Sequence, residues 1–119
     1  MKRLTESFKH ATDGIIAAFR VEKNLKIHFA AMICVIILGF AVGLSAFEWI
    51  ICIALFALAI SAEMFNTALE KTMDYINEDY DERIRFIKDA SAGAVLAIAV
   101  ASAVIGLIIF IPKLTAILI

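Results

Sequence analysis

Long uncharged stretches alternate with short polar segments along this chain. Asp, Glu, Lys and Arg are all absent from residues 29–47, 49–62 and 90–112. A helix needs about 20 mostly apolar residues to cross the hydrocarbon core of a bilayer. The second stretch reaches that length only if its helix continues past Glu63 to about Met73. We therefore predict three transmembrane helices, over residues 29–47, 49–73 and 90–112. Phe47, Glu48 and Trp49 are expected to form a tight hairpin between the first two.

The first 28 residues follow a different pattern. Their apolar residues recur at spacings of three and four, which places them on one face of a helix and leaves charged residues on the other. This face comprises Leu4, Phe8, Ala11, Ile15, Ala18 and Phe19. The pattern is typical of a helix that lies in the headgroup region of a membrane. We predict an amphipathic surface helix over residues 1–28, within a single domain that spans residues 1–119.

Composition supports a membrane protein over a soluble domain or a nucleic-acid-binding protein. The chain is 63% hydrophobic and 19% charged, against about 45–50% and about 25% in soluble domains. A net charge of -1 gives no reason to expect nucleic acid as a partner. Lys and Arg concentrate in residues 1–28 and in the loop from about Asp74 to Asp89. Loops rich in Lys and Arg stay on the cytoplasmic side of a membrane. We therefore expect a multi-pass protein of the plasma membrane whose N-terminus is cytoplasmic and whose C-terminus is outside.

Polar residues interrupt the second span at helical spacing. Glu63, Asn66, Glu70 and Asp74 fall within an arc of roughly 80° on one helix. Ionisable groups in a span are costly, at about 2.5–3.5 kcal/mol each on insertion scales, and usually mark function. These groups need a partner. A metal ion, a basic side chain, a bound substrate and a purely structural polar seam all remain open.

Two further segments place charge at the cytoplasmic edge of the membrane. Lys88 and Asp89 are expected near the first turn of the third span, where a helix end favours phosphate; alternatively, the lysine snorkels and the aspartate caps. Glu22 lies at the same edge as Glu70 and can add a carboxylate oxygen to a hard cation such as Mg²⁺. His28 has no His or Cys at ligand spacing, so it is expected to be an interfacial or helix-packing residue.

Together these segments resemble a known family. Glu63-Met-Phe-Asn66-Thr-Ala-Leu-Glu70, followed by Lys88-Asp89-Ala-Ser-Ala-Gly, resembles the prokaryotic diacylglycerol kinase family. Residues 22–28 look most like its Gram-positive undecaprenol kinase branch. The resemblance implies an all-α homotrimer whose subunits have three transmembrane helices and a surface helix. It also implies Mg²⁺-dependent transfer of the γ-phosphate of ATP to a membrane lipid alcohol. Undecaprenol is the expected acceptor, and diacylglycerol is the alternative.

The same resemblance implies a role for each polar residue. Glu63 falls on the catalytic carboxylate that takes the proton from the lipid hydroxyl, while Glu22 and Glu70 fall on the metal-binding acids. The residues expected at the bound nucleotide and its metal are Arg3, His10, Glu22, Asn66, Glu70, Asp74, Lys88 and Asp89. Of these, His10 stands where the best-known member has an aromatic residue.

Two readings from other classes also fit the polar residues. A small oligomeric transporter or proton pathway would use Glu63, Asn66 and Glu70 as relay groups, with no need for Lys88 or a nucleotide. A non-catalytic assembly subunit would need Glu70 only for stability.

Overall fold

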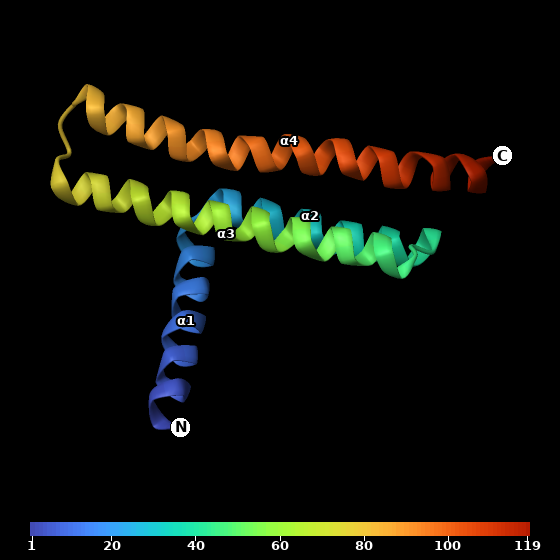
Figure 1. The fold of residues 1–119 in the computed structure, drawn as a ribbon, viewed down its shortest axis with the longest axis horizontal. Coiled ribbons are helices and arrows are strands. Elements are labelled where there is room, and N and C mark those ends of the chain that lie inside the picture. Colours follow the sequence, from blue (N-terminus) through green and yellow to red (C-terminus); the bar gives the residue numbers. More distant parts are fainter.

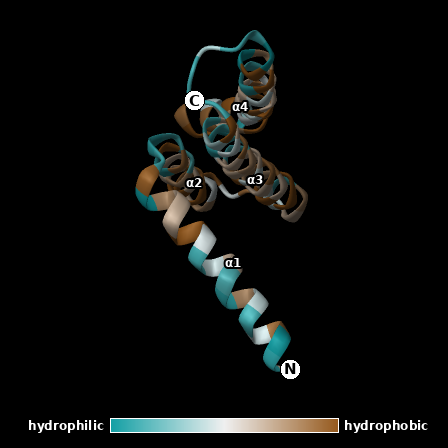
Figure 2. Cartoon of the chain, turned by 90° about the vertical axis from the view of Figure 1, so that its left-hand side faces the viewer, coloured by the Kyte–Doolittle hydropathy of each residue, from teal (hydrophilic) through white to brown (hydrophobic).

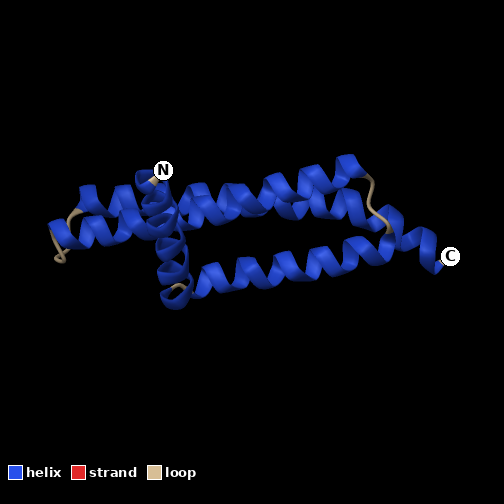
Figure 3. Ribbon diagram, turned by 90° about the horizontal axis from the view of Figure 1, so that it is seen from below, coloured by secondary structure: helices blue, strands red, loops and turns tan.

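The computed structural model describes all 119 residues as four α-helices joined by short connections (Figures 1 and 3). These helices are α1 (Lys2–Val21), α2 (Lys23–Val42), α3 (Ala46–Ile76) and α4 (Glu82–Leu118). The last three lie side by side as a bundle, and α1 projects away from it. Each bundle helix is long and apolar enough to cross a membrane, which confirms an all-helical chain with three candidate spans.

Few side chains are buried within one chain, and several of these are polar. Only 9 of the 119 residues are buried, and Glu63, Asn66 and Thr67 are among them. Large apolar side chains instead cover the outside of α2, α3 and α4, whereas hydrophilic and hydrophobic residues alternate along α1 (Figure 2). An exposed apolar surface of this extent belongs against lipid or another protein subunit. The buried polar groups therefore stand out as the unusual part of the interior.

The structure corrects the expected position of the first hairpin from residues 47–49 to residues 43–45. Gly43 ends α2 in the left-handed region, with φ of 76°, and its N–H donates to the carbonyl of Gly39. Ser45 then caps α3: its Oγ accepts from the Glu48 N–H at 3.2 Å, while Glu48 Oε1 accepts from the Ser45 N–H at 2.9 Å. Glu48 is therefore part of a capping box, and the charge that suggested a turn lies in the first turn of α3.

A single extended residue separates the projecting helix from the bundle. Glu22 has φ and ψ of -101° and 113°, so α1 and α2 meet at a sharp bend there. Lys26 Nζ donates to the Arg20 carbonyl at 3.2 Å and satisfies one of the carbonyls left free at the end of α1. The helix expected over residues 1–28 is thus shorter, and residues 23–28 form the first turns of α2.

The loop between α3 and α4 is also shorter than the expected segment from Asp74 to Asp89. It consists of residues 77–81, and Asp81 caps α4 by accepting from the Arg83 N–H at 2.8 Å. Hydrogen bonds from Arg83 lower the pKa of Asp81 to about 2. Lys88 and Asp89 are consequently about two turns inside α4, so they do not occupy its first turn as the sequence suggested.

The two ends of the bundle differ in their connections. The α2–α3 turn and the C-terminus lie at one end, and the α3–α4 loop lies at the other (Figure 1). At the first end, Lys113 Nζ of α4 lies 3.0 Å from Glu48 Oε1 at the start of α3. This ion pair holds α3 and α4 together at the end opposite the expected nucleotide-contact residues.

Candidate functional site

Glu63 is the most deeply buried charged residue of the chain. Its side chain is 2% exposed, and it lies on α3 one turn before Asn66 and Thr67, which are also buried. The one side chain within ion-pair distance of its carboxylate is His28 of α2, whose Nε2 lies 3.9 Å from Oε2. A carboxylate at this depth, with one titratable neighbour, has the surroundings expected of a functional acid.

Two polar atoms next to Glu63 are buried without a partner. Asn66 Oδ1 and Thr67 Oγ1 make no hydrogen bond within the chain. Buried polar atoms are nearly always hydrogen-bonded in native proteins. Two orphaned oxygens beside a buried carboxylate therefore indicate that a ligand, water or a second subunit completes this region.

The polar face of α3 becomes more accessible toward its C-terminal end. Glu70 is partly exposed and Asp74 is exposed. Asp74 Oδ1 accepts a hydrogen bond from Lys88 Nζ of α4, so the structure joins two of the residues expected at the nucleotide. Nearby on α4, Arg85 Nε lies 3.4 Å from Asp89 Oδ2. Basic and acidic groups thus gather where α3 and α4 approach the loop that connects them.

The residues expected to hold a metal are two carboxylates from different parts of the chain. Glu22 occupies the bend between α1 and α2, and Glu70 lies on α3; neither makes an ion pair within the chain. No group of three or more metal-ligating side chains is present. Two carboxylates nevertheless suit Mg²⁺, which is usually held by one or two carboxylates together with water and substrate phosphates.

Arg3 and His10 lie apart from the other predicted residues. Both are exposed on α1, and this part of α1 projects away from the bundle (Figure 1). Within one chain, the structure does not bring them to the buried polar face of α3.

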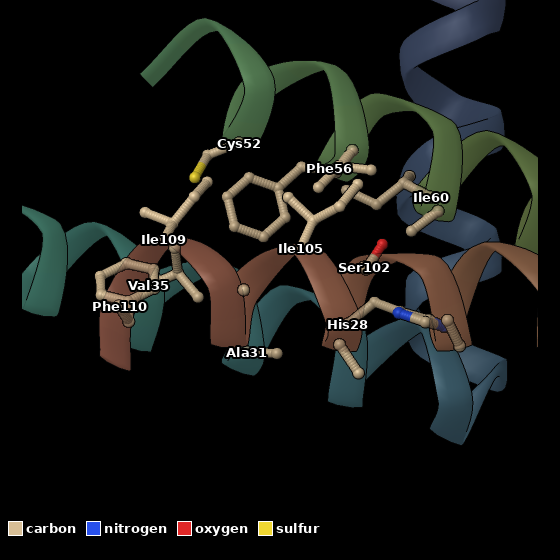
Figure 4. Close-up of a pocket in the computed structure, with 15 residues that line it drawn as sticks. His28, Ala31, Val35, Cys52, Phe56, Ile60, Ser102, Ile105, Ile109 and Phe110 are labelled. Atoms are coloured by element: carbon tan, nitrogen blue, oxygen red, sulfur yellow. The ribbon is translucent and has the colours of Figure 1, made fainter. Parts of the chain in front are cut away.

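An apolar cavity of about 270 Å³ lies between α2, α3 and α4. Twelve of its 15 lining residues are hydrophobic. Its polar lining includes His28 of α2 and Ser102 of α4 (Figure 4). The Ser102 hydroxyl is buried without a hydrogen-bond partner. Glu63 does not itself line the cavity, but His28 does, and its Nε2 lies 3.9 Å from the Glu63 carboxylate.

Sequence reasoning missed His28 and Ser102 as site residues. The sequence predicts an interfacial or helix-packing role for His28, because it lacks a metal-ligand companion at ligand spacing. The available signal was its position at the start of an uncharged span, where an ionisable side chain is rare. Ser102 gave no signal, since single serines are common in transmembrane helices.

Comparison with known proteins gives a family and two relatives. Residues 9–110 match the sequence model of the family described as "Prokaryotic diacylglycerol kinase". The chain is 45% identical over 114 residues to "Undecaprenol kinase" of Bacillus subtilis (strain 168), covering 96% of this chain and 93% of that protein. It is 31% identical over 117 residues to "Diacylglycerol kinase" of Synechocystis sp., covering 98% of this chain and 67% of that protein.

Proposed function

This chain belongs to the prokaryotic diacylglycerol kinase family and is a lipid kinase, and we propose that it transfers the γ-phosphate of ATP to the hydroxyl of undecaprenol. Both relatives carry kinase names, which favours this activity over the transporter and assembly readings. We choose undecaprenol as the proposed acceptor because the relative with 45% identity carries the name undecaprenol kinase.

The observation that carries the proposal is the position of Glu63. Its carboxylate is almost fully buried and lies beside His28, which lines an apolar cavity between three candidate membrane helices. A lipid alcohol can place its hydrocarbon chain in this cavity and its hydroxyl at the polar end. A water-soluble acceptor has no hydrocarbon chain to bury in an apolar cavity, so the site suits a lipid acceptor.

The cavity size bears on the choice between the two lipids. At about 270 Å³, it is slightly smaller than the range of about 300–1,000 Å³ that is typical of pockets for drug-sized ligands. It therefore has room for a short length of hydrocarbon. Undecaprenol presents a single chain next to its hydroxyl, whereas diacylglycerol brings two acyl chains, so the cavity favours undecaprenol.

In the proposed reaction, Glu63 acts as the general base. The lipid O–H bond breaks and its proton moves to the Glu63 carboxylate, while the lipid oxygen forms a bond to the γ-phosphorus. The bond from the γ-phosphorus to the bridging oxygen breaks, and ADP leaves with that electron pair. The proton is released from Glu63 before the next turnover.

Glu22 and Glu70 are proposed to hold Mg²⁺, which neutralises phosphate charge when bound. Glu70 is two turns beyond Glu63, about 10 Å along the helix, so one carboxylate can bind metal while the other meets the lipid. Lys88 is proposed to release its hydrogen bond to Asp74 and to donate instead to a phosphate oxygen of the nucleotide. The remaining nucleotide contacts are assigned to Arg3, His10, Asn66 and Asp89.

We also propose a homotrimer with α1 on the cytoplasmic membrane surface and the C-terminus outside. The outward apolar side chains of the bundle need lipid or protein around them, and closed symmetric oligomers are the usual solution. Arg3 and His10 lie away from the polar face within one chain, which is consistent with α1 contributing to a neighbouring subunit. The basic residues of α1 and of the start of α4 support the orientation.

The direct test is an acceptor comparison. Purified protein in lipid nanodiscs receives γ-labelled ATP, Mg²⁺ and either undecaprenol or diacylglycerol at equal mole fraction. We expect a higher kcat/KM for undecaprenol and no transfer in the presence of EDTA. A higher kcat/KM for diacylglycerol would contradict the assigned acceptor, and transfer to neither lipid would contradict the activity itself.

A further inference from the structure

We propose that His28 is a positioning residue that balances the charge of Glu63 and so keeps it available as a base. This inference rests on the proposed function, since it assigns His28 a role in the same reaction. It goes beyond the helix-packing role that the sequence suggested for this residue.

The first argument is that Glu63 has no other cationic partner within its own chain. His28 is the one basic side chain within 4.0 Å of its carboxylate. The facing part of α4, residues 90–112, carries no charged residue, and α3 is uncharged from residue 49 to residue 62. The lysines that flank this part of α4 pair with other residues, Lys88 with Asp74 and Lys113 with Glu48. Among the side chains of one subunit, the imidazole is therefore the one that can balance the charge of Glu63.

The second argument is energetic. A carboxylate removed from water without a partner is so unfavourable that it takes up a proton instead. A protonated carboxyl group cannot accept the proton of a lipid hydroxyl. Within the chain, the imidazole of His28 is the one group placed to supply the opposite charge.

The third argument is geometric. The Nε2–Oε2 distance of 3.9 Å is too long for a direct hydrogen bond. His28 therefore acts through its charge and leaves the lone pairs of the carboxylate free for the substrate hydroxyl. The His28 side chain is 23% exposed and lines the cavity (Figure 4), so the same side chain adjoins both the proposed lipid position and the base.

The kinetic test uses two substitutions that separate charge from packing. His28→Gln removes the charge and His28→Lys retains a positive charge, while Ile27→Ala changes the exposed neighbouring residue as a control. We expect His28→Gln to lower kcat roughly 10- to 100-fold, with the KM for ATP changed less than about twofold. His28→Lys is expected to recover at least part of kcat, and Ile27→Ala to leave it unchanged.

Two kinetic results would overturn the proposal. One is a kcat for His28→Gln within twofold of the wild-type value. The other is an equal loss in the Gln and Lys variants, because that pattern indicates that only the shape of the imidazole matters.

A spectroscopic test does not require turnover. The infrared band of a protonated carboxyl group at Glu63 is identified by its absence in Glu63→Gln. We expect this band to be stronger in His28→Gln than in the wild-type protein; the same band intensity in both would overturn the proposal. Nitrogen NMR of His28 in the wild-type protein gives a further check if the Gln variant does not fold, because a neutral imidazole would contradict the assigned role. If the kinase assay detects no phosphorylated lipid, these spectra still test whether His28 balances the charge of Glu63. A failure of the proposed function can therefore be distinguished from a failure of this inference.

Discussion

Lys88 of α4 donates a hydrogen bond to Asp74 near the C-terminal end of α3. The pair joins two helices next to the loop that connects them, although 14 positions separate the residues in the sequence. Both side chains are partly or largely accessible, so the contact can open when an anion arrives. Phosphate, like carboxylate, accepts a charge-assisted hydrogen bond from an ammonium group, so it can take the place of Asp74.

Replacement of Lys88 by Ala is expected to weaken nucleotide use. Loss of one charge-assisted hydrogen bond, worth about 1.5–3 kcal/mol, corresponds to a decrease in kcat/KM for ATP of roughly 10- to 100-fold. Steady-state kinetics with varied ATP measure this change, and the KM for the lipid should stay the same. Lys71→Ala, at an exposed site without an ion pair, serves as the control; equal effects of both substitutions would argue against a specific role of Lys88.

Neutralisation of either proposed metal ligand is expected to raise the Mg²⁺ requirement. Glu22→Gln and Glu70→Gln should each increase the Mg²⁺ concentration at half-maximal rate by roughly tenfold, which corresponds to about 1.4 kcal/mol. A Mg²⁺ titration of the initial rate checks this expectation. Glu78→Gln in the exposed loop should leave the titration curve unchanged. An unchanged curve in the Glu22 and Glu70 variants would remove both from the metal site.

A larger side chain at Gly106 is expected to compete with the lipid. Gly106 lines the cavity, and a Cβ atom added there meets no atom within 4 Å; circular dichroism checks that Gly106→Leu folds. We expect the KM for undecaprenol to increase severalfold while the KM for ATP stays constant. Val104→Leu, on an exposed position of the same helix, controls for added volume. An unaltered lipid KM in Gly106→Leu would mean that the acceptor binds elsewhere.

Acid is expected to destabilise the start of α4 through Asp81. Its pKa is lowered from 3.8 to about 2 by hydrogen bonds from Arg83. A carboxylate with a lowered pKa in the folded state stabilises the fold above its unfolded-state value, and this contribution is lost as the pH falls from about 3.8 toward about 2. Thermal unfolding in detergent across this range measures the effect. Asp81→Asn should retain a capping side chain and show a smaller change in Tm; an identical pH dependence would contradict the assignment.

The main features of the fold follow from the sequence because a bilayer imposes strict requirements. A membrane span needs a long apolar segment, so charge-free stretches locate α2, α3 and α4. Polar residues in such a segment are costly, which is why the spacing of Glu63 and Asn66 identified the buried face of α3. These predictions depend on local composition and helical geometry alone.

The remaining features depend on packing or on short capping contacts. Glu48 interrupts an apolar stretch and looked like a turn residue, but its hydrogen bonds with Ser45 place it inside a helix. The approach of His28 to Glu63 depends on the register between α2 and α3. A sequence pattern gives the face of each helix but not the register between two helices, so this contact could not be predicted.

The central claim is that Glu63 takes the proton from a lipid alcohol during phosphoryl transfer. It is tested most directly by measuring transfer of labelled γ-phosphate to undecaprenol by the wild-type protein and by Glu63→Gln, which preserves the size of the side chain. The account predicts that the substitution lowers kcat by about 10²- to 10⁴-fold, with unchanged helical content and oligomeric state. Turnover by Glu63→Gln at the wild-type rate would contradict it.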